Sequence, residues 1–373
     1  MTTPRFVMRA CALGCGSSTS PPAEPGTEVS GCDGATLLAN PADFAARGPW
    51  AVGARTVTVG NLTAEVWYPA PPGSDAGKST ERYDIRVHLP AAEQAKIPDA
   101  DNPWQSCDCV RDLPLDEQHG PYPVVLFVHG TASFRHQSLH QVTHWASRGF
   151  VVVAADHPGL RLGDLLAMAC GGSSPSQALS ADLDAILAAL GQPSGELAFL
   201  AGRIDTSRIA VTGHSAGGGA AAAASSKPGV RVVISMAGNR ATTNATSIYF
   251  GGLADSVVSW GQVKTAYDGA AKPRHLVGIQ NGGHLAFSDL CETKNTGGQD
   301  LLEVANEHQI CGAQLAGFLF DCDPSHLDGP TGWDIVNHVS SAVLESTLHC
   351  QAPASLASLK ATFPDVAEYA EEL

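Results

Sequence analysis

The chain has 373 residues, of which 44% are hydrophobic and 16% charged, so it can bury a sizeable core and is neither disordered nor collagen-like. Its 37 acidic residues outnumber its 22 basic residues, and the formal charge of −15 argues against a nucleic-acid partner because phosphate backbones would repel it. The sequence holds no run of about 18 uninterrupted apolar residues, so we expect no membrane-spanning helix.

The first 35 residues are predicted to be a leader followed by a flexible tether. Arg5 and Arg9 flank a short apolar patch that ends at Cys15, and a stretch rich in Ser, Pro and Gly follows. This order resembles a bacterial lipoprotein signal, in which the cysteine carries the lipid. A disordered or cleaved N-terminus is the alternative. We expect a protein that is secreted, or anchored at the bacterial cell envelope through a lipid on Cys15.

The cysteine content favours export as well. Without Cys11 and Cys15, an even set of eight remains, which suits a disulfide framework: Cys32, Cys107, Cys109, Cys170, Cys291, Cys311, Cys322 and Cys350. Eight cysteines allow 105 pairings, between which the sequence does not choose. Because Cys107 and Cys109 are so close in the chain, we predict that each bonds to a different partner. No second closely spaced pair accompanies them, so we expect no metal site there. At least one bond should tether residues 292–332.

Residues 36–373 are predicted to form one α/β domain. Residues 56–68 alternate around a Gly-Asn break and indicate an antiparallel hairpin, and residues 70–120 are weakly periodic, as in a long connection or cap. From residue 123 onward, apolar runs predict buried strands at 124–128, 150–155, 208–212, 230–235, 247–250 and 275–279. Helices are predicted between them at about 137–148, 176–190, 216–226 and 257–267, with a last one near 334–349. This alternation predicts a mostly parallel sheet with helices on both faces.

A strand, a sharp turn and a helix surround Ser215. The strand at 208–212 runs into Gly213-His214-Ser215-Ala216-Gly217 and then into an alanine-rich helix, which is the G-x-S-x-G pattern in its required setting. The strained turn would raise the serine hydroxyl above the sheet, and the flanking glycines would let neighbouring backbones approach. The sequence therefore predicts Ser215 as a nucleophile.

A serine nucleophile needs a histidine base and a carboxylate that orients it. In this architecture the chain order is serine, acid, histidine, each beyond the end of a strand. His284 follows the strand at 275–279 on a glycine-rich loop, and Asp255 follows the strand at 247–250. We therefore predict a Ser215–Asp255–His284 triad. Asp156 is the less favoured candidate for the acid. The structural alternative is that Asp255 only caps a helix.

Backbone amides should complete the site. The loop after the strand at 124–128 reads His129-Gly130-Thr131, and Gly130 would permit a twist that turns the Thr131 amide inward. The amide of Ala216, the residue after the nucleophile, would lie beside it at the helix N-terminus. We predict Thr131 and Ala216 as the oxyanion hole.

Three histidines offer a competing interpretation. His136, His140 and His144 recur every four residues on the first predicted helix, and histidines so spaced can share a zinc ion. The glutamate of H-E-x-x-H is missing, and no carboxylate lies on that face. We therefore predict a solvated helix face and no metal.

These motifs together resemble the α/β-hydrolase superfamily, in the branch that holds dienelactone hydrolases, platelet-activating-factor acetylhydrolases and bacterial cutinases and polyester hydrolases. The matching segments are 120–123 leading into His129-Gly130, 147–152, 202–205 leading into the Gly213–Gly219 turn, 252–255 and 282–284. The resemblance implies a serine hydrolase of the carboxylesterase, lipase or cutinase type, without metal or cofactor. Polyester hydrolases of this branch usually carry aromatic residues at two positions, which here fall at Thr131 and within Met236–Asn239.

The functional prediction is hydrolysis of a carboxylic ester through an acyl-enzyme. The substrate is expected to be a lipid-like ester, a short-to-medium acyl ester or a polyester. An amidase or peptidase with the same triad is the alternative, since the triad does not reveal the leaving group. A non-catalytic surface protein on a hydrolase fold fits less well, because no triad residue is missing. We expect a monomer.

Overall fold

The computed structural model describes residues 27–28, 32, 35–320 and 322–373. The predicted signal, including Arg5, Arg9, Cys11 and Cys15, lies outside these residues. Within them, no helix is both long enough and apolar enough to cross a bilayer.

The helices and strands follow one another along the chain as predicted for an α/β protein. The strands are β1 (Thr27–Glu28), β2 (Thr36–Leu37), β3 (Ala51–Val59), β4 (Leu62–Ala70), β5 (Arg82–Tyr83), β6 (Gln105–Ser106), β7 (Val110–Arg111), β8 (Tyr122–Val128), β9 (Val151–Ala155), β10 (Ile204–His214), β11 (Val230–Met236), β12 (Thr246–Gly252), β13 (Arg274–Ile279) and β14 (Val366–Glu372). The α-helices are α1 (Ala91–Gln94), α2 (Leu139–Ser147), α3 (Leu162–Ala169), α4 (Leu179–Gly191), α5 (Ala216–Ala223), α6 (Trp260–Gly269), α7 (Leu301–Glu307), α8 (Gly329–Leu348) and α9 (Leu359–Thr362). The 3₁₀ turns are η1 (Ile85–His88), η2 (Gly195–Leu200), η3 (Ala224–Ser226) and η4 (Ala313–Leu315).

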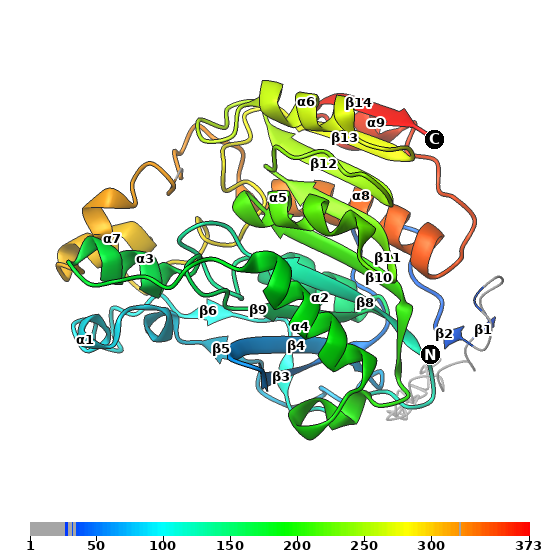
Figure 1. Ribbon diagram of the computed structural model, residues 1–373, viewed down its shortest axis with the longest axis horizontal. Coiled ribbons are helices and arrows are strands. Elements are labelled where there is room, and N and C mark those ends of the chain that lie inside the picture. Colours follow the sequence, from blue (N-terminus) through cyan, green and yellow to red (C-terminus); the bar gives the residue numbers. More distant parts are fainter. Residues whose placement is uncertain (1–26, 29–31, 33–34, 321) are drawn as a thin grey trace, which may run out of the picture.

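Ten of the strands in the described part of the chain form one twisted sheet (Figure 1). Their order is β14-β13-β12-β11-β10-β8-β9-β4-β3-β7. The six strands from β13 to β9 in this order are mutually parallel, while the hairpin β3–β4 and the edge strand β14 add antiparallel pairs. The predicted mostly parallel α/β sheet and its N-terminal hairpin are therefore confirmed.

Both faces of the sheet are covered by helices, because successive residues of each buried strand point to opposite sides. In β8, Val125 and Phe127 pack with α2 and α8, whereas Val124 and Leu126 pack with α4 and α5. Figure 1 shows α4 and α5 in front of the sheet and α8 behind it. The parallel strands therefore end at one protected edge, where α/β proteins place their ligand sites.

All eight cysteines that the structure describes are paired. The bonds are Cys32–Cys350, Cys107–Cys109, Cys170–Cys311 and Cys291–Cys322. The predicted framework and the predicted tether of residues 292–332 are confirmed, with two bonds reaching that segment. The prediction that Cys107 and Cys109 bond to different partners was wrong. A bend at Asp108 brings their Cα atoms to 5.1 Å, within the ordinary disulfide range.

Buried histidines make the fold sensitive to acid. Burial lowers the pKa of His129 to about 4, and that of His144, His214 and His349 to about 3. Between about pH 6.5 and pH 4 the unfolded chain therefore binds protons that the folded chain does not, so the free energy of unfolding falls as the pH falls. Each histidine contributes up to about 1.4 kcal/mol per pH unit in this window.

We therefore expect the melting temperature to drop clearly between pH 7 and pH 5. The variant His349→Leu removes one of these groups, whose ring lies against Phe150 at a centroid distance of 4.2 Å. Its melting temperature should fall less steeply over the same interval. Scanning calorimetry in buffers of equal ionic strength measures both slopes, and a flat wild-type profile would contradict the expectation.

Candidate active site

Ser215 lies on the tight turn between β10 and α5. Its backbone is left-handed, with a φ of 57°, and its amide donates to the carbonyl of Met236 at 2.8 Å. The turn has no room for larger neighbours: a Cβ at Gly213 would lie 2.3 Å from the Gly217 carbonyl oxygen, and one at Gly217 would lie 2.1 Å from that of Val128. The glycines on either side are thus required by crowding, as the G-x-S-x-G pattern predicts.

Asp255 and His284 meet at the carboxyl edge of the sheet. Asp255 follows β12 and His284 follows β13, and the Asp255 Oδ2 to His284 Nδ1 distance is 2.9 Å. Both side chains are buried. Because an ionised carboxylate only accepts, His284 Nδ1 donates this bond, which leaves Nε2 unprotonated in the neutral ring.

The carboxylate of Asp255 is held ionised. Burial alone would raise its pKa, but the hydrogen bond and charge of His284 outweigh burial and lower the pKa below its usual value. The amides of Val257 and Val258 assist, each donating to Oδ1 at 2.8 Å. The alternative of Asp255 as a helix cap was wrong, because the N-cap residue of α6 is Ser259.

The competing carboxylates are occupied elsewhere. Asp156 accepts from the Arg135 amide at 2.8 Å and pairs with the Arg135 guanidinium. Asp289 accepts from the His140 amide at 3.1 Å, and burial raises its pKa. Neither geometry offers a carboxylate to His284, so the pairing with Asp255 agrees with the sequence-based choice of acid.

The two amides predicted for the oxyanion hole lie near Ser215. Thr131 and Ser215 line one cavity, and Ala216 is the first residue of α5. Among the described residues, neither the Thr131 amide nor the Ala216 amide has an acceptor, whereas the Ala132 amide donates to Leu160 at 2.9 Å. Two unused donors beside a serine suit an oxyanion.

A buried hydrogen-bond chain, which the sequence did not predict, joins three loops of the site. The Gly130 amide donates to Gln137 Oε1 at 2.7 Å, and Gln137 Nε2 donates to His214 Nδ1 at 2.6 Å. His214 Nε2 in turn donates to the His284 carbonyl at 2.8 Å. These hydrogen bonds require a neutral His214 ring, which agrees with its pKa, because burial lowers that pKa to about 3. The hydrogen bonds therefore link the loop of Gly130, the turn of Ser215 and the loop of His284.

We expect Gln137→Met to lower kcat by about 10- to 100-fold, the cost of two lost buried hydrogen bonds, with KM within about threefold. The matched control is Gln141→Met on the adjoining helix α2, because the buried side chain of Gln141 has no hydrogen-bond partner among the described residues. Steady-state kinetics on a soluble ester separates the two variants. Equal kcat in both would show that Gln137 does not position the site.

The predicted solvated face of His136, His140 and His144 was wrong. His136 precedes α2 and is buried against Tyr83, with ring centroids 3.8 Å apart, and His144 is buried beside Ser341 at 2.9 Å. Only His140 keeps an exposed side chain. Because His136 lies in the loop before α2, the three histidines do not share one helix face. In the described part of the chain, no group of three or more His, Cys, Asp or Glu side chains is arranged to hold a metal ion.

The chain is similar to known proteins over much of its length. The family model described as "PETase: PET hydrolase-like" matches residues 115–296, a range that includes Thr131, Ser215, Asp255 and His284. The structure of a ferulic acid esterase from Streptomyces cinnamoneus is similar with a TM-score of 0.56 and 18% identity, covering 85% of this chain and 94% of that chain. The chain has the α/β-hydrolase fold. The resemblance to the polyester-hydrolase branch is thereby confirmed, while no curated protein matches the chain.

Two cavities of this protein meet at Ser215. One has a volume of about 120 Å³ and is lined largely by apolar side chains, together with Thr131, Ser215 and His284. The other, of about 540 Å³, lies along α5 and includes Ser215, Ala216, Asn239 and Arg240 in its lining. We name the first the chamber and the second the groove. Ser215 therefore borders one largely apolar cavity and one whose lining mixes polar and apolar side chains.

Proposed function

We propose that the protein is a serine carboxylic-ester hydrolase that works through an acyl-enzyme. His284 Nε2 takes the proton of the Ser215 hydroxyl as its oxygen forms a bond to the ester carbonyl carbon. Asp255 stabilises the resulting imidazolium, and the Thr131 and Ala216 amides hold the oxyanion. The alkoxide then leaves with the proton of His284, and water repeats the sequence to release the acid and regenerate Ser215.

The observation that carries this proposal is the 2.9 Å pairing of His284 with Asp255 at the same edge of the sheet as the turn of Ser215. A base oriented by an ionised carboxylate is the arrangement that activates a serine hydroxyl. The match of residues 115–296 to a PET hydrolase-like family supports ester chemistry in particular. The apolar chamber supports a substrate with an apolar group, such as a lipid-like or short-to-medium acyl ester.

A fluorophosphonate probe tests the nucleophile. Folded protein should form one covalent adduct, which peptide mass spectrometry should place on Ser215, and heat-unfolded protein should form none. An unreacted Ser215 in folded protein would refute the proposal. Matched p-nitrophenyl esters and p-nitroanilides of the same acid then distinguish an esterase from an amidase, and we expect the ester to react faster by orders of magnitude.

We also propose that the protein is secreted or lipid-anchored at the cell envelope. The four disulfides support this, because such bonds persist in oxidising compartments. With ten cysteines in the chain and eight of them paired, thiol titration of denatured, unreduced protein should find two or fewer free thiols. Six or more free thiols would refute both the framework and the export proposal. Mass spectrometry of cell-envelope protein would reveal a lipid on Cys15.

A further inference from the structure

About half of the residues that line the chamber belong to segments outside the family match. Residues 85–103 and 301–320 contribute much of the lining, together with the start of α3. Figure 1 shows α1, α3 and α7 gathered at one end of the molecule, beyond the sheet. The family model covers residues 115–296 only. The family match therefore does not describe this part of the chamber, whose shape has to be read from the chain's own residues.

The chamber is apolar along its length. Near Ser215 its lining includes a cluster formed by Ile85, Phe134, Leu285 and Leu290. The part built by α3 and α7 is lined by a second cluster, which contains Ile97, Leu166, Val304, Ile310 and Ala313. The polar side chains in the lining are few, and the charged one, Arg86, already pairs with Asp84 and Asp99. A charged or strongly hydrated substrate group would therefore lose water with little compensation.

The size of the chamber sets a limit on its occupant. Its volume is about 120 Å³. An engineered apolar cavity of roughly 150 Å³ in another protein stays dry and takes up benzene. By this comparison the chamber accepts a group about as large as a short alkyl chain or a single ring, and a long acyl chain would exceed it.

Covalent bonds hold the chamber walls in place. Cys170–Cys311 joins the end of α3 to the insertion, and Cys291–Cys322 joins the beginning of the insertion to its later part. A Cβ at Gly312 would lie 3.0 Å from Leu166 Cδ2, which shows how closely the bonded segments pack. The amide of Leu327, five residues after Cys322, donates a hydrogen bond to the Asn281 carbonyl at 2.9 Å, and Asn281 lies three residues before His284. The insertion is thus fixed at several points.

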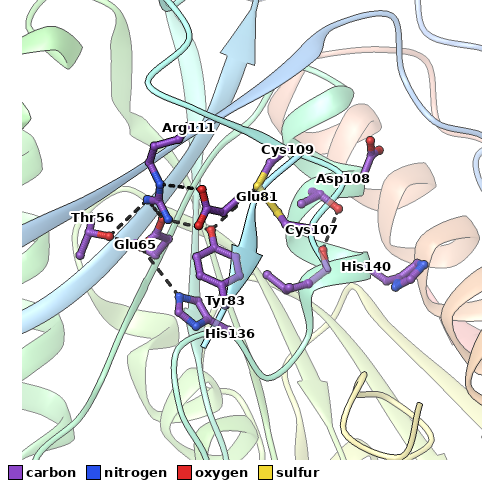
Figure 2. The surroundings of a disulfide bond; sticks show 12 residues. Thr56, Glu65, Glu81, Tyr83, Cys107, Asp108, Cys109, Arg111, His136 and His140 are labelled. Atoms are coloured by element: carbon purple, nitrogen blue, oxygen red, sulfur yellow. Dashed lines mark hydrogen bonds and ion pairs between the residues drawn. A yellow bond between two sulfur atoms is a disulfide. The ribbon is translucent and has the colours of Figure 1, made fainter. Parts of the chain in front are cut away.

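The wall formed by residues 85–103 is anchored to the sheet by a buried ion cluster beside the Cys107–Cys109 bond (Figure 2). Glu65 on β4 is fully buried and pairs with Arg111, and it accepts a hydrogen bond from the Tyr83 hydroxyl at 3.0 Å. Tyr83 and Arg111 lie on either side of this wall in the chain. The wall therefore cannot swing away without exposing the partners of a buried carboxylate.

We infer that the chamber restricts this enzyme to small-molecule esters with one compact apolar group, of about six carbons or one ring, and that the Cys170–Cys311 bond fixes this limit. The inference rests on the proposed ester hydrolysis at Ser215. A polyester chain is a poor substrate under this inference, because the part of it on the chamber side of Ser215 would have to be accommodated in a space of about 120 Å³. The compact group belongs to the acyl half or to the alcohol half of the ester.

Two substrate series distinguish the halves: p-nitrophenyl esters from acetate to palmitate, and acetates of alcohols from ethanol to hexadecanol. In one series kcat/KM should rise about fourfold per methylene, up to four to six carbons, and then fall at least about 100-fold by sixteen carbons. Polyester nanoparticles should release soluble product at a rate near that of the protein-free control. Comparable rates on hexyl and hexadecyl members of both series, or rapid release from nanoparticles, would overturn the inference.

Variants test the walls. Leu166→Ala should move the preferred length by two to three carbons, and Val304→Ala serves the same purpose if the first variant folds poorly. Leu315→Ala is the control, since Leu315 belongs to the same insertion, is 59% exposed and does not line the chamber. The double variant Cys170→Ser/Cys311→Ser should flatten the length preference.

Reactivity of Ser215 with the fluorophosphonate probe keeps the two proposals separate. If wild-type protein reacts with the probe yet the wall variants leave the length preference unchanged, the chamber inference fails and the proposed function remains. If the probe does not react with Ser215, the proposed function itself fails. A shifted preference in Leu166→Ala, with an unshifted one in Leu315→Ala, supports the inference.

Discussion

Replacing Ser215 with alanine is expected to lower kcat for ester hydrolysis by on the order of 10⁴- to 10⁶-fold, because no other group can form the acyl-enzyme. The folded state should survive. The backbone amide of residue 215 still donates to Met236, and its carbonyl still accepts from Gly219 at 3.1 Å, since neither bond involves the hydroxyl. Circular-dichroism melting should therefore give a Tm within a few degrees of wild type.

The control for this variant is Ser133→Ala. Ser133 is buried, lines the same chamber, and its hydroxyl has no hydrogen-bond partner among the described residues. Its loss should change kcat by less than about threefold, because no buried hydrogen bond is broken. Activity of Ser215→Ala within tenfold of wild type, measured on protein free of wild-type contamination, would place the nucleophile elsewhere.

The second large effect is expected for Asp255→Asn, at about 10⁴-fold in kcat. The asparagine amide can donate to His284 Nδ1, which favours the tautomer whose proton sits on Nε2. That nitrogen then cannot accept the proton of Ser215. KM should change little, because Asp255 does not line the chamber. Steady-state kinetics on a soluble ester, with the Tm measured alongside, separates this effect from loss of folding.

Two further carboxylate variants make the assignment of the acid decisive. Asp289→Asn keeps an acceptor oxygen for the His140 amide and should remain active. Asp156→Asn weakens the ion pair with Arg135 and should reduce stability more than kcat. If Asp156→Asn rather than Asp255→Asn abolished turnover in folded protein, Asp255 would not be the acid.

The parts of the site that could be predicted from sequence are those encoded locally. The turn at Ser215 is one: a strand, closely spaced glycines and a helix lie within some fifteen residues, and crowding permits little else at Gly213 and Gly217. The positions of Asp255 and His284 followed from strand ends, because parallel strands bring their carboxyl ends to one edge. These arguments need no knowledge of distant contacts.

The missed features depend on contacts between distant segments. Gln137 and His214 are 77 residues apart, and only the folded sheet brings their side chains together. Helix α3 was not predicted as a helix because it is short and its apolar side packs on the insertion instead of on the main core. Strand β14 carries polar and charged residues, since it forms the antiparallel edge of the sheet and leaves many side chains in contact with water.

The Cys107–Cys109 bond shows a different limit. The prediction was that two cysteines so close in the chain would each bond to a different partner, whereas the structure bonds them to each other. The bend at Asp108 that shortens the distance carries no strong turn signal in the sequence.

The contacts of Cys32 and β2 determine which side of the protein would face away from a support to which its N-terminal segment was attached. Strand β2 pairs Thr36 with Gly120, just ahead of β8, and Cys32 is bonded to Cys350. These contacts lie at the amino ends of the parallel strands, whereas Ser215 and the chamber lie beyond their carboxyl ends, and Figure 1 shows β2 and α7 at opposite sides of the molecule. Attachment through the segment ahead of Cys32 would thus turn the reactive side outward, toward freely diffusing molecules and away from the support.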